Sequence, residues 1–284
     1  MNGSMGYQQE MERFHQLLLE EERSQATREK YMRDVRAFLR YIGEDPISKE
    51  RVICYKQYLV KKYAASSVNS MLAAANRFLK SIGRYDCTVR SLKIQRRAFR
   101  ASQRELSKAE YYRLLAAAKR RKDTRLYMLM QAICATGIRV SELQFITVES
   151  LRSGVAQVSL KGKTRQILIP SKLRKELRRY ASEKGIGSGS IFITKTGRPM
   201  DRSNILHAMK LLCREANVEP GKVFPHNLRH LFACLYYKAS KDISRLADLL
   251  GHANINTTRI YTCVSGSEQS RQIDKLGLAI KNTA

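Results

Sequence analysis

The stretch that decides the fold and the chemistry lies near the carboxyl end: FPHNLRH at residues 224–230, LLGH at 249–252 and ANINTTRIYTC at 253–263. His226 and Arg229 stand three positions apart, so a helix places both side chains on one face. Gly251 stands where a glycine commonly follows the last turn of a helix. A guanidinium matches phosphate oxygens, an imidazole can donate to one or move a proton, and the phenol of Tyr261 can act as a nucleophile. The stretch therefore predicts helices that assemble groups suited to chemistry on a phosphodiester.

The composition indicates a protein that binds a polyanion. Lys and Arg number 53 against 25 Asp and Glu, a formal net charge of +28 in 284 residues. Such an excess favours salt-sensitive binding to nucleic acid, with a basic membrane-surface protein as the alternative. No apolar run has the length of a membrane span or the pattern of a secretory signal, so we expect a cytoplasmic protein with no membrane partner.

The cysteines and histidines do not indicate a metal site. The six cysteines stand far apart without a CxxC pair, which is typical of reduced thiols rather than a disulfide framework or a zinc site. His226 and His230 have the spacing of a helical zinc pair, but no Glu follows His226 and no carboxylate or Cys is placed as a third ligand. We therefore expect neither a metal nor a cofactor.

An apolar run in the middle of the chain leads to a further arginine. Residues 126–135 are nearly all apolar and too few to span a membrane, which predicts a buried central helix that ends at Thr136-Gly137. Arg139 stands just beyond that end, and a charge placed there is unfavourable unless it is paired or used. The alternatives are a salt bridge with Glu142, three residues along, and a place in a reactive cleft.

Short runs rich in β-branched residues predict a hairpin with a basic tip. Residues 155–160 and 167–169 have the pattern of strands around Lys161-Gly162-Lys163-Thr164-Arg165, and residues 191–193 are a candidate third strand. The rest of the pattern is helical. We therefore expect a mainly α fold with a small antiparallel β-sheet.

Periodicity and charge divide the chain into two domains. Residues 7–85 carry apolar stripes at helical spacing, which predict four helices. Residues 91–104 carry several Lys and Arg and no acid, which is typical of a linker that lies along phosphates. Ser107 and Glu110 then have the spacing of a capping box, which begins the first helix of a second domain.

The motifs resemble those of a known family. His226-x-x-Arg229-His230, Leu250-Gly251-His252 and Tyr261 nine positions later are similar to the C-terminal signature of tyrosine recombinases, the integrase and Xer-type enzymes. The upstream motif of that family matches ATGIRVSEL at residues 135–143. The resemblance implies a SAM-like helical core-binding domain over residues 1–90, a basic linker over 91–104 and a catalytic α+β domain over 105–284. It also implies that the chain ends in a tail helix, residues 267–284.

The resemblance implies a reaction as well. Tyr261 attacks a DNA phosphate and leaves a 3′-phosphotyrosyl bond with a free 5′-hydroxyl. Arg139 and Arg229 stabilise the charge that develops on the phosphate oxygens, without a metal ion. His226 and His252 donate further hydrogen bonds or assist the phenol proton.

In the family, a lysine on a β-hairpin protonates the leaving oxygen. Lys161 fits this role best by spacing, and Lys163 is the alternative. His230 repeats the family pattern, but we expect it to be structural. Three residues differ from the family pattern outside the six catalytic positions: Phe232, Cys234 and Cys263.

The implied partner is double-stranded DNA with inverted-repeat core sites. Basic and amide side chains from the first domain, the linker and the hairpin are candidates for contact with it: Arg33, Arg36, Arg40, Asn69, Asn76, Arg77, Lys80, Arg96, Arg97, Arg100, Lys163 and Arg165. Ile273, Leu276 and Ile280 give the tail a narrow apolar stripe that needs a partner surface. The resemblance implies exchange of the tail between subunits of a homotetramer; the alternative is packing on its own domain.

Three functions fit these residues. The first is a site-specific recombinase that acts in integration, excision or resolution of a mobile element, whether phage, transposon or plasmid, or that resolves chromosome dimers. A monomeric type IB topoisomerase shares the nucleophile chemistry. The third is a catalytically silent DNA-binding accessory protein, and the intact Arg139, Arg229 and Tyr261 count against it. Chain length and the tail favour the recombinase.

Overall fold

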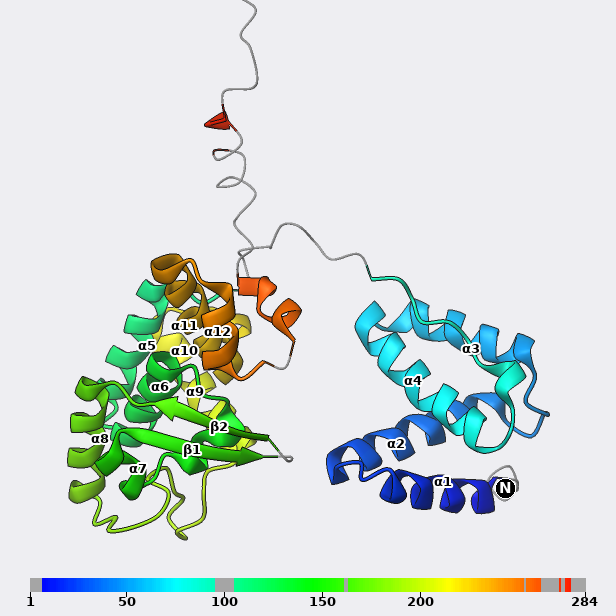
Figure 1. The fold of residues 1–284 in the computed structure, drawn as a ribbon, viewed down its shortest axis with the longest axis horizontal. Helices are drawn as coiled ribbons and strands as arrows, with labels where there is room; N and C mark the ends of the chain where they lie inside the picture. Colours follow the sequence, from blue (N-terminus) through cyan, green and yellow to red (C-terminus); the bar gives the residue numbers. More distant parts are fainter. Residues whose placement is uncertain are drawn as a thin grey trace, which may run out of the picture. The chain divides into compact units, whose positions relative to one another are not determined.

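The structure is a computed structural model that describes residues 7–94, 105–160, 163–252, 254–261, 271 and 274–276. The chain divides into two compact units, residues 1–96 and 97–284 (Figure 1). Some predictions fall outside the described residues and stay predictions: those for Lys161, for Arg96, Arg97 and Arg100 of the linker, and for Ile273 and Ile280 of the tail.

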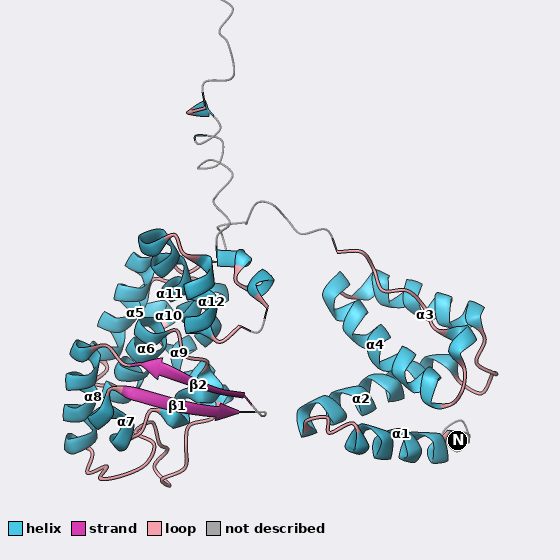
Figure 2. Cartoon of the chain, viewed as in Figure 1, coloured by secondary structure: helices cyan, strands magenta, loops and turns pink. Residues whose placement is uncertain are grey.

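The first unit is a helical bundle. Within residues 7–94 it contains four α-helices, as expected: α1 (Gln8–Glu20), α2 (Gln25–Ile42), α3 (Lys49–Lys62) and α4 (Ala65–Ser81), followed by the 3-10 turn η1 (Tyr85–Cys87) (Figure 2). Its interior combines aliphatic side chains with aromatic rings. The rings of Phe14 and Phe78 meet edge to face at 5.5 Å, and those of Phe38 and Tyr55 at 5.1 Å. This packing gives the unit a core of its own.

The segment after η1 lies along α4 through two asparagine side chains. The amide of Asn69 donates to the Leu92 carbonyl at 3.0 Å and accepts from the Leu92 N–H at 2.7 Å. Asn76 bonds Val89 in the same two-way manner, at 2.8 and 2.9 Å. Arg77 forms an ion pair with Glu21. These three side chains are among the expected DNA contacts, and in the structure their polar groups hold the unit together.

The second unit contains the reactive stretch and is built mainly of helices. It begins with α5 (Lys108–Arg120), capped as expected by Ser107 and Glu110, whose side chains each accept a backbone N–H of the other. The elements that follow are α6 (Thr124–Thr136), η3 (Val140–Phe145), α7 (Val148–Ser153), β1 (Val155–Leu160), β2 (Lys163–Leu168), α8 (Ser171–Glu183), α9 (Arg202–Leu211), α10 (Cys213–Ala216), η4 (Pro220–Lys222), α11 (Pro225–Ser240), α12 (Ile243–Leu250), η5 (Ile255–Thr257) and η6 (Arg259–Tyr261). Among the described residues no helix has the length and apolarity to cross a membrane.

Helix α6 is the centre of this unit, as its apolar sequence predicts. It packs against α5, α8, α9 and α11, and Leu129, Met130, Ala132 and Ile133 are fully buried. A helix enclosed on several sides has little freedom to shift. The residues at its carboxyl end, where the reactive groups gather, are therefore placed by the core itself.

The sheet is small and antiparallel, as the sequence predicts. β1 and β2 form an antiparallel pair in which Val155 faces Leu168 and Leu160 faces Lys163. In the described part of the chain the sheet has two strands, so the predicted third strand over residues 191–193 is wrong. Ile193 makes one isolated bridge to Pro199, while the two residues before it are buried in the core. Ile191 and Phe192 are therefore apolar because they pack in the core, and not because they belong to a strand.

Candidate active site

The first arginine of the site is placed by the end of a buried helix. Gly137 follows α6 in the left-handed conformation, with φ of +65°. A β-carbon there would come within 2.5 Å of the Phe232 ring, so only glycine fits both the conformation and the space. The turn brings out Arg139, whose side chain is 39% exposed. Its Nη1 bonds Glu142 Oε1 at 2.8 Å, and its Nη2 donates to the Gly251 carbonyl at 3.1 Å.

The second arginine is buried. Arg229 lies on α11 and is 2% exposed. It donates to the Gly137 carbonyl at 2.6 Å and to the Leu250 carbonyl at 2.7 Å, and its Nη2 lies 3.1 Å from His252 Nε2. Burial, and next the charge of Arg139, lower the pKa of Arg229 to about 10. The side chain therefore stays charged at neutral pH.

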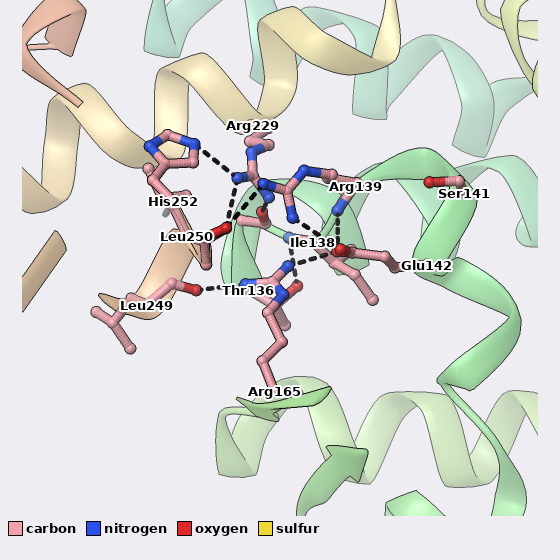
Figure 3. Close-up of polar contacts among 12 residues, drawn as sticks. Thr136, Ile138, Arg139, Ser141, Glu142, Arg165, Arg229, Leu249, Leu250 and His252 are labelled. Atoms are coloured by element: carbon pink, nitrogen blue, oxygen red, sulfur yellow. Dashed lines mark hydrogen bonds and ion pairs between the residues drawn. The ribbon is translucent and has the colours of Figure 1, made fainter. Parts of the chain in front are cut away.

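The carboxyl end of α12 organises these cations. The last carbonyls of a helix lack partners within it and form its negative end, which favours positive groups. Three successive carbonyls there accept from three guanidinium groups (Figure 3): Leu249 from Arg165 at 2.7 Å, Leu250 from Arg229 at 2.7 Å and Gly251 from Arg139 at 3.1 Å. The arginines come from β2, from α11 and from the turn between α6 and η3. The helix end thus gathers charges from parts of the chain that are far apart in sequence.

Glu142 and Arg165 also belong to this cluster, although the sequence analysis did not assign them to the site. Glu142, 3% exposed, accepts from the backbone N–H of Arg139 at 2.9 Å and forms an ion pair with Arg165. Burial alone would raise the pKa of Glu142, but hydrogen bonds from Arg165 and Arg139 lower it below its usual value. The carboxylate therefore stays charged and fixes both guanidinium groups. The spacing of Glu142 from Arg139 was a signal for this contact; the sequence contained none for Arg165.

His252 lies between Arg229 and the segment that carries Tyr261. Its Nδ1 is 2.8 Å from Thr258 Oγ1, and its Nε2 faces Arg229. Burial, followed by the charges of Arg229 and Arg139, lowers the pKa of His252 to about 4. The ring is therefore neutral at physiological pH, and one of its nitrogens can accept a hydrogen bond.

Tyr261 is docked on the same cluster. It ends the 3-10 turn η6, is 4% exposed and packs with Ala233, Leu246 and Leu250. Its ring lies 5.1 Å from the His230 ring and 6.1 Å from the His252 ring, centroid to centroid, and stacks on the latter. The phenol thus lies beside the arginine cluster, as its sequence position predicts.

The other predicted catalytic residues lie on α11 and at the hairpin. His226 is exposed in the first turn of α11, and its charge contributes to the low pKa of His252. His230 is buried, and its ring nitrogens lie 3.5 and 3.8 Å from Cys234 Sγ. Lys163 begins β2, and Lys161, two positions earlier in the sequence, lies outside the described residues. The structure thus brings together Arg139, Arg229, His252 and Tyr261.

The arrangement is suited to binding and attacking a phosphate. Arg139 and Arg229 are close enough for the charge of one to lower the pKa of the other. A phosphate placed between them would relieve that repulsion and accept hydrogen bonds from both planar groups. The neutral imidazole and the phenol lie on the adjoining side. These are the groups needed for nucleophilic displacement at phosphorus.

Comparison with known proteins gives the family. The phage integrase family matches residues 104–268, more than half of the chain, and the phage integrase N-terminal SAM-like domain matches residues 11–84. The chain belongs to the phage integrase family. This confirms the resemblance to tyrosine recombinases and the mainly helical, two-part fold expected from the sequence.

Two tyrosine recombinases match this integrase-family chain over different lengths. Tyrosine recombinase XerA of Thermococcus kodakarensis is 29% identical over 278 residues, which cover 94% of this chain and 96% of XerA. Tyrosine recombinase XerC of Erythrobacter litoralis is 30% identical over 171 residues, 57% of this chain and 56% of XerC, so that alignment spans about half of the relative. A lambda integrase tetramer bound to a Holliday junction has the same fold, with a TM-score of 0.72 at 19% identity, covering 89% of this chain and 76% of that one.

Proposed function

We propose that the protein is a site-specific DNA recombinase that cuts and rejoins duplex DNA through a covalent tyrosyl intermediate. The observation that carries the proposal is that Arg139, Arg229 and His252 meet at the end of α12, with the Tyr261 ring stacked on His252. The 29% sequence identity with a tyrosine recombinase, which extends over 94% of this chain, supports the proposal. The net charge of +28 supports a DNA substrate.

The proposed step is a transesterification at phosphorus. The Tyr261 oxygen forms a bond to a DNA phosphorus while the bond to the 5′-oxygen breaks, which leaves a 3′-phosphotyrosyl link. The phenol loses its proton and the departing 5′-oxygen gains one. One ester bond replaces another, so the reaction needs no ATP. Attack by the 5′-hydroxyl of a second strand reverses the step and exchanges the strands.

The arginines stabilise the charge that builds up on the phosphate oxygens. Arg139 is partly exposed and can meet the phosphate first, while Arg229 is held from within by two carbonyls. Because their donors are positioned before the substrate arrives, little reorganisation is needed in the transition state. Glu142 keeps the Arg139 fork in one orientation. No metal ion is required for this role.

The reaction needs two proton transfers, one from the phenol and one to the 5′-oxygen, and the candidate groups are histidines and a lysine. His252 stacks on Tyr261 and stays neutral, and its low pKa makes it a weak base, so it serves as a hydrogen-bonding group; His226, exposed at the start of α11, is the candidate for the phenol proton. We assign the proton donor for the 5′-oxygen to Lys161, with Lys163 as the alternative. Lys161 follows β1 in the sequence and Lys163 begins β2, the strand whose Arg165 contacts the cluster.

Replacement of Lys161 by alanine is expected to slow cleavage of ordinary DNA by roughly 10²–10⁴-fold, the usual contribution of a general acid. A substrate with sulfur at the 5′-bridging position leaves without protonation, so it restores the rate of Lys161→Ala. The measurement is the rate of adduct formation on both substrates. Lys163→Ala is the matched control. If the sulfur substrate restored the rate of Lys163→Ala and not that of Lys161→Ala, Lys163 would be the proton donor.

We propose that the partner is DNA with inverted-repeat core sites and that four subunits act together. The lambda integrase seen as a tetramer on a Holliday junction supports this assembly. In the part of the tail that the structure describes, Leu276 is 64% exposed, which fits a residue that needs a partner surface. Exchange of residues 267–284 between subunits would let a neighbour control Tyr261. The substrate in the cell is then a mobile element or a replicon to be resolved.

An exchange assay tests the function. Core sites are first selected from a random DNA pool by affinity for the protein, and two copies are placed on separate duplexes with distinct flanks. We expect products that join flanks from both duplexes, in buffer with EDTA. Relaxation of supercoils without exchange would indicate a topoisomerase, and binding without any strand cleavage would indicate an accessory protein; either outcome contradicts the proposal.

A further inference from the structure

Thr258 connects the two groups that must act together in the reaction. It is fully buried, with 0% exposure, three residues before the nucleophile. Its hydroxyl lies 2.8 Å from His252 Nδ1, and its carbonyl accepts the backbone N–H of Tyr261 at 2.9 Å. One residue therefore contacts the histidine through its side chain and the nucleophile through its main chain. Nothing in its sequence context required the hydroxyl to face inward.

The partners of His252 determine its tautomer. A guanidinium has donors and no acceptor, so His252 Nε2, which faces Arg229, must be the acceptor of that contact. The ring proton of the neutral imidazole then lies on Nδ1 and is donated to Thr258 Oγ1. Without this hydroxyl, the Nδ1–H of His252 would be left without an acceptor.

We propose that Thr258 is a positioning residue of the recombination reaction: its hydroxyl holds the His252 ring and its tautomer, and so sets that ring against Tyr261. The inference rests on the proposed function. The hydroxyl oxygen accepts the Nδ1–H of the ring and so keeps Nε2 turned toward Arg229. Valine has the same shape and cannot accept a hydrogen bond.

Kinetics provide the first test. Thr258→Val is expected to slow adduct formation on a suicide substrate by roughly 10- to 100-fold, the factor that corresponds to one buried hydrogen bond, with DNA affinity unchanged. Thr258→Ser recovers most of the rate. The matched control is Thr257→Val, because Thr257 is exposed and its hydroxyl donates to the Asn254 carbonyl at 2.7 Å. A Thr258→Val rate equal to that of wild type would overturn the inference.

A double variant separates positioning from general damage. If Thr258 acts through His252, Thr258→Val adds nothing to the loss already caused by His252→Ala. A further loss of the same size in the double variant would mean that Thr258 supports the fold and not the ring. Thermal unfolding of each variant shows whether the fold is kept.

A spectroscopic test needs no DNA and is therefore independent of the proposed function. The protein has five histidines, and the His252 signals in ¹⁵N-histidine spectra are those absent from His252→Ala. We expect wild type and Thr258→Ser to show a protonated Nδ1 and a bare Nε2, and Thr258→Val to lose this single pattern. A protonated Nε2 in the free wild-type protein, or an unchanged pattern in Thr258→Val, would overturn the inference. Failure of wild type to form any adduct would count against the proposed function alone.

Discussion

Replacement of Tyr261 by phenylalanine is expected to abolish the covalent protein–DNA adduct while DNA affinity stays near that of wild type. The Tyr261 ring is buried among Ala233, Leu246 and Leu250, and phenylalanine keeps that packing. The variant lacks only the oxygen that would bond to phosphorus. A suicide substrate resolved on a denaturing gel measures the adduct, and a gel shift measures binding.

The control for this variant is Tyr237→Phe. Tyr237 packs against the same small apolar cluster, so it loses a phenolic oxygen in a comparable environment. It should form the adduct at the wild-type rate. An adduct formed normally by Tyr261→Phe would mean that another residue is the nucleophile.

Replacement of Arg139 by alanine is expected to reduce cleavage by roughly 10²–10³-fold and to weaken DNA binding far less. The charge of Arg139 is needed most when the phosphate oxygens gain charge, whereas many other cations contribute to binding. Its side chain is partly exposed, so the fold should tolerate the change. Single-turnover cleavage and a binding titration at one fixed salt concentration separate the two effects.

Arg229 needs a gentler replacement because it is buried. Alanine would leave the carbonyls of Gly137 and Leu250 without their donor, at about 1–3 kcal/mol each. Arg229→Lys keeps the charge and removes the planar fork, and we expect it to slow cleavage by a similar factor. The control is Arg179→Ala, an exposed guanidinium paired with Glu176 and Glu183. Near wild-type cleavage by both active-site variants in EDTA would contradict the two-arginine scheme.

Local signals in the sequence were enough to predict the helices and to identify the residues that the structure brings together at the site. Apolar periodicity predicted the helices of the first unit, and the length of the run ending at Gly137 predicted the buried α6. For Arg139 the sequence left a salt bridge with Glu142 and a place in a cleft as alternatives. The structure shows the salt bridge at the cluster itself, because one buried carboxylate can hold an arginine whose exposed edge remains available.

Contacts between distant segments could not be predicted from the sequence. Arg165 looks like one more basic residue of a hairpin tip, but its side chain reaches the end of α12, where it donates to the Leu249 carbonyl. Asn69 and Asn76 resemble groove-reading side chains, yet they bond a segment that follows the next turn. Ile191 and Phe192 are buried without a partner strand, and hydrophobic periodicity does not distinguish such a run from a strand.

Mass spectrometry of the trapped intermediate tests the central claim most directly. The protein is incubated with a nicked suicide substrate in EDTA, digested with protease and nuclease, and the modified peptide is sequenced. We predict a nucleotide joined through its 3′-phosphate to Tyr261, in a peptide that Tyr261→Phe does not yield. A nucleotide on any other residue, or one joined through a 5′-phosphate, would contradict the account.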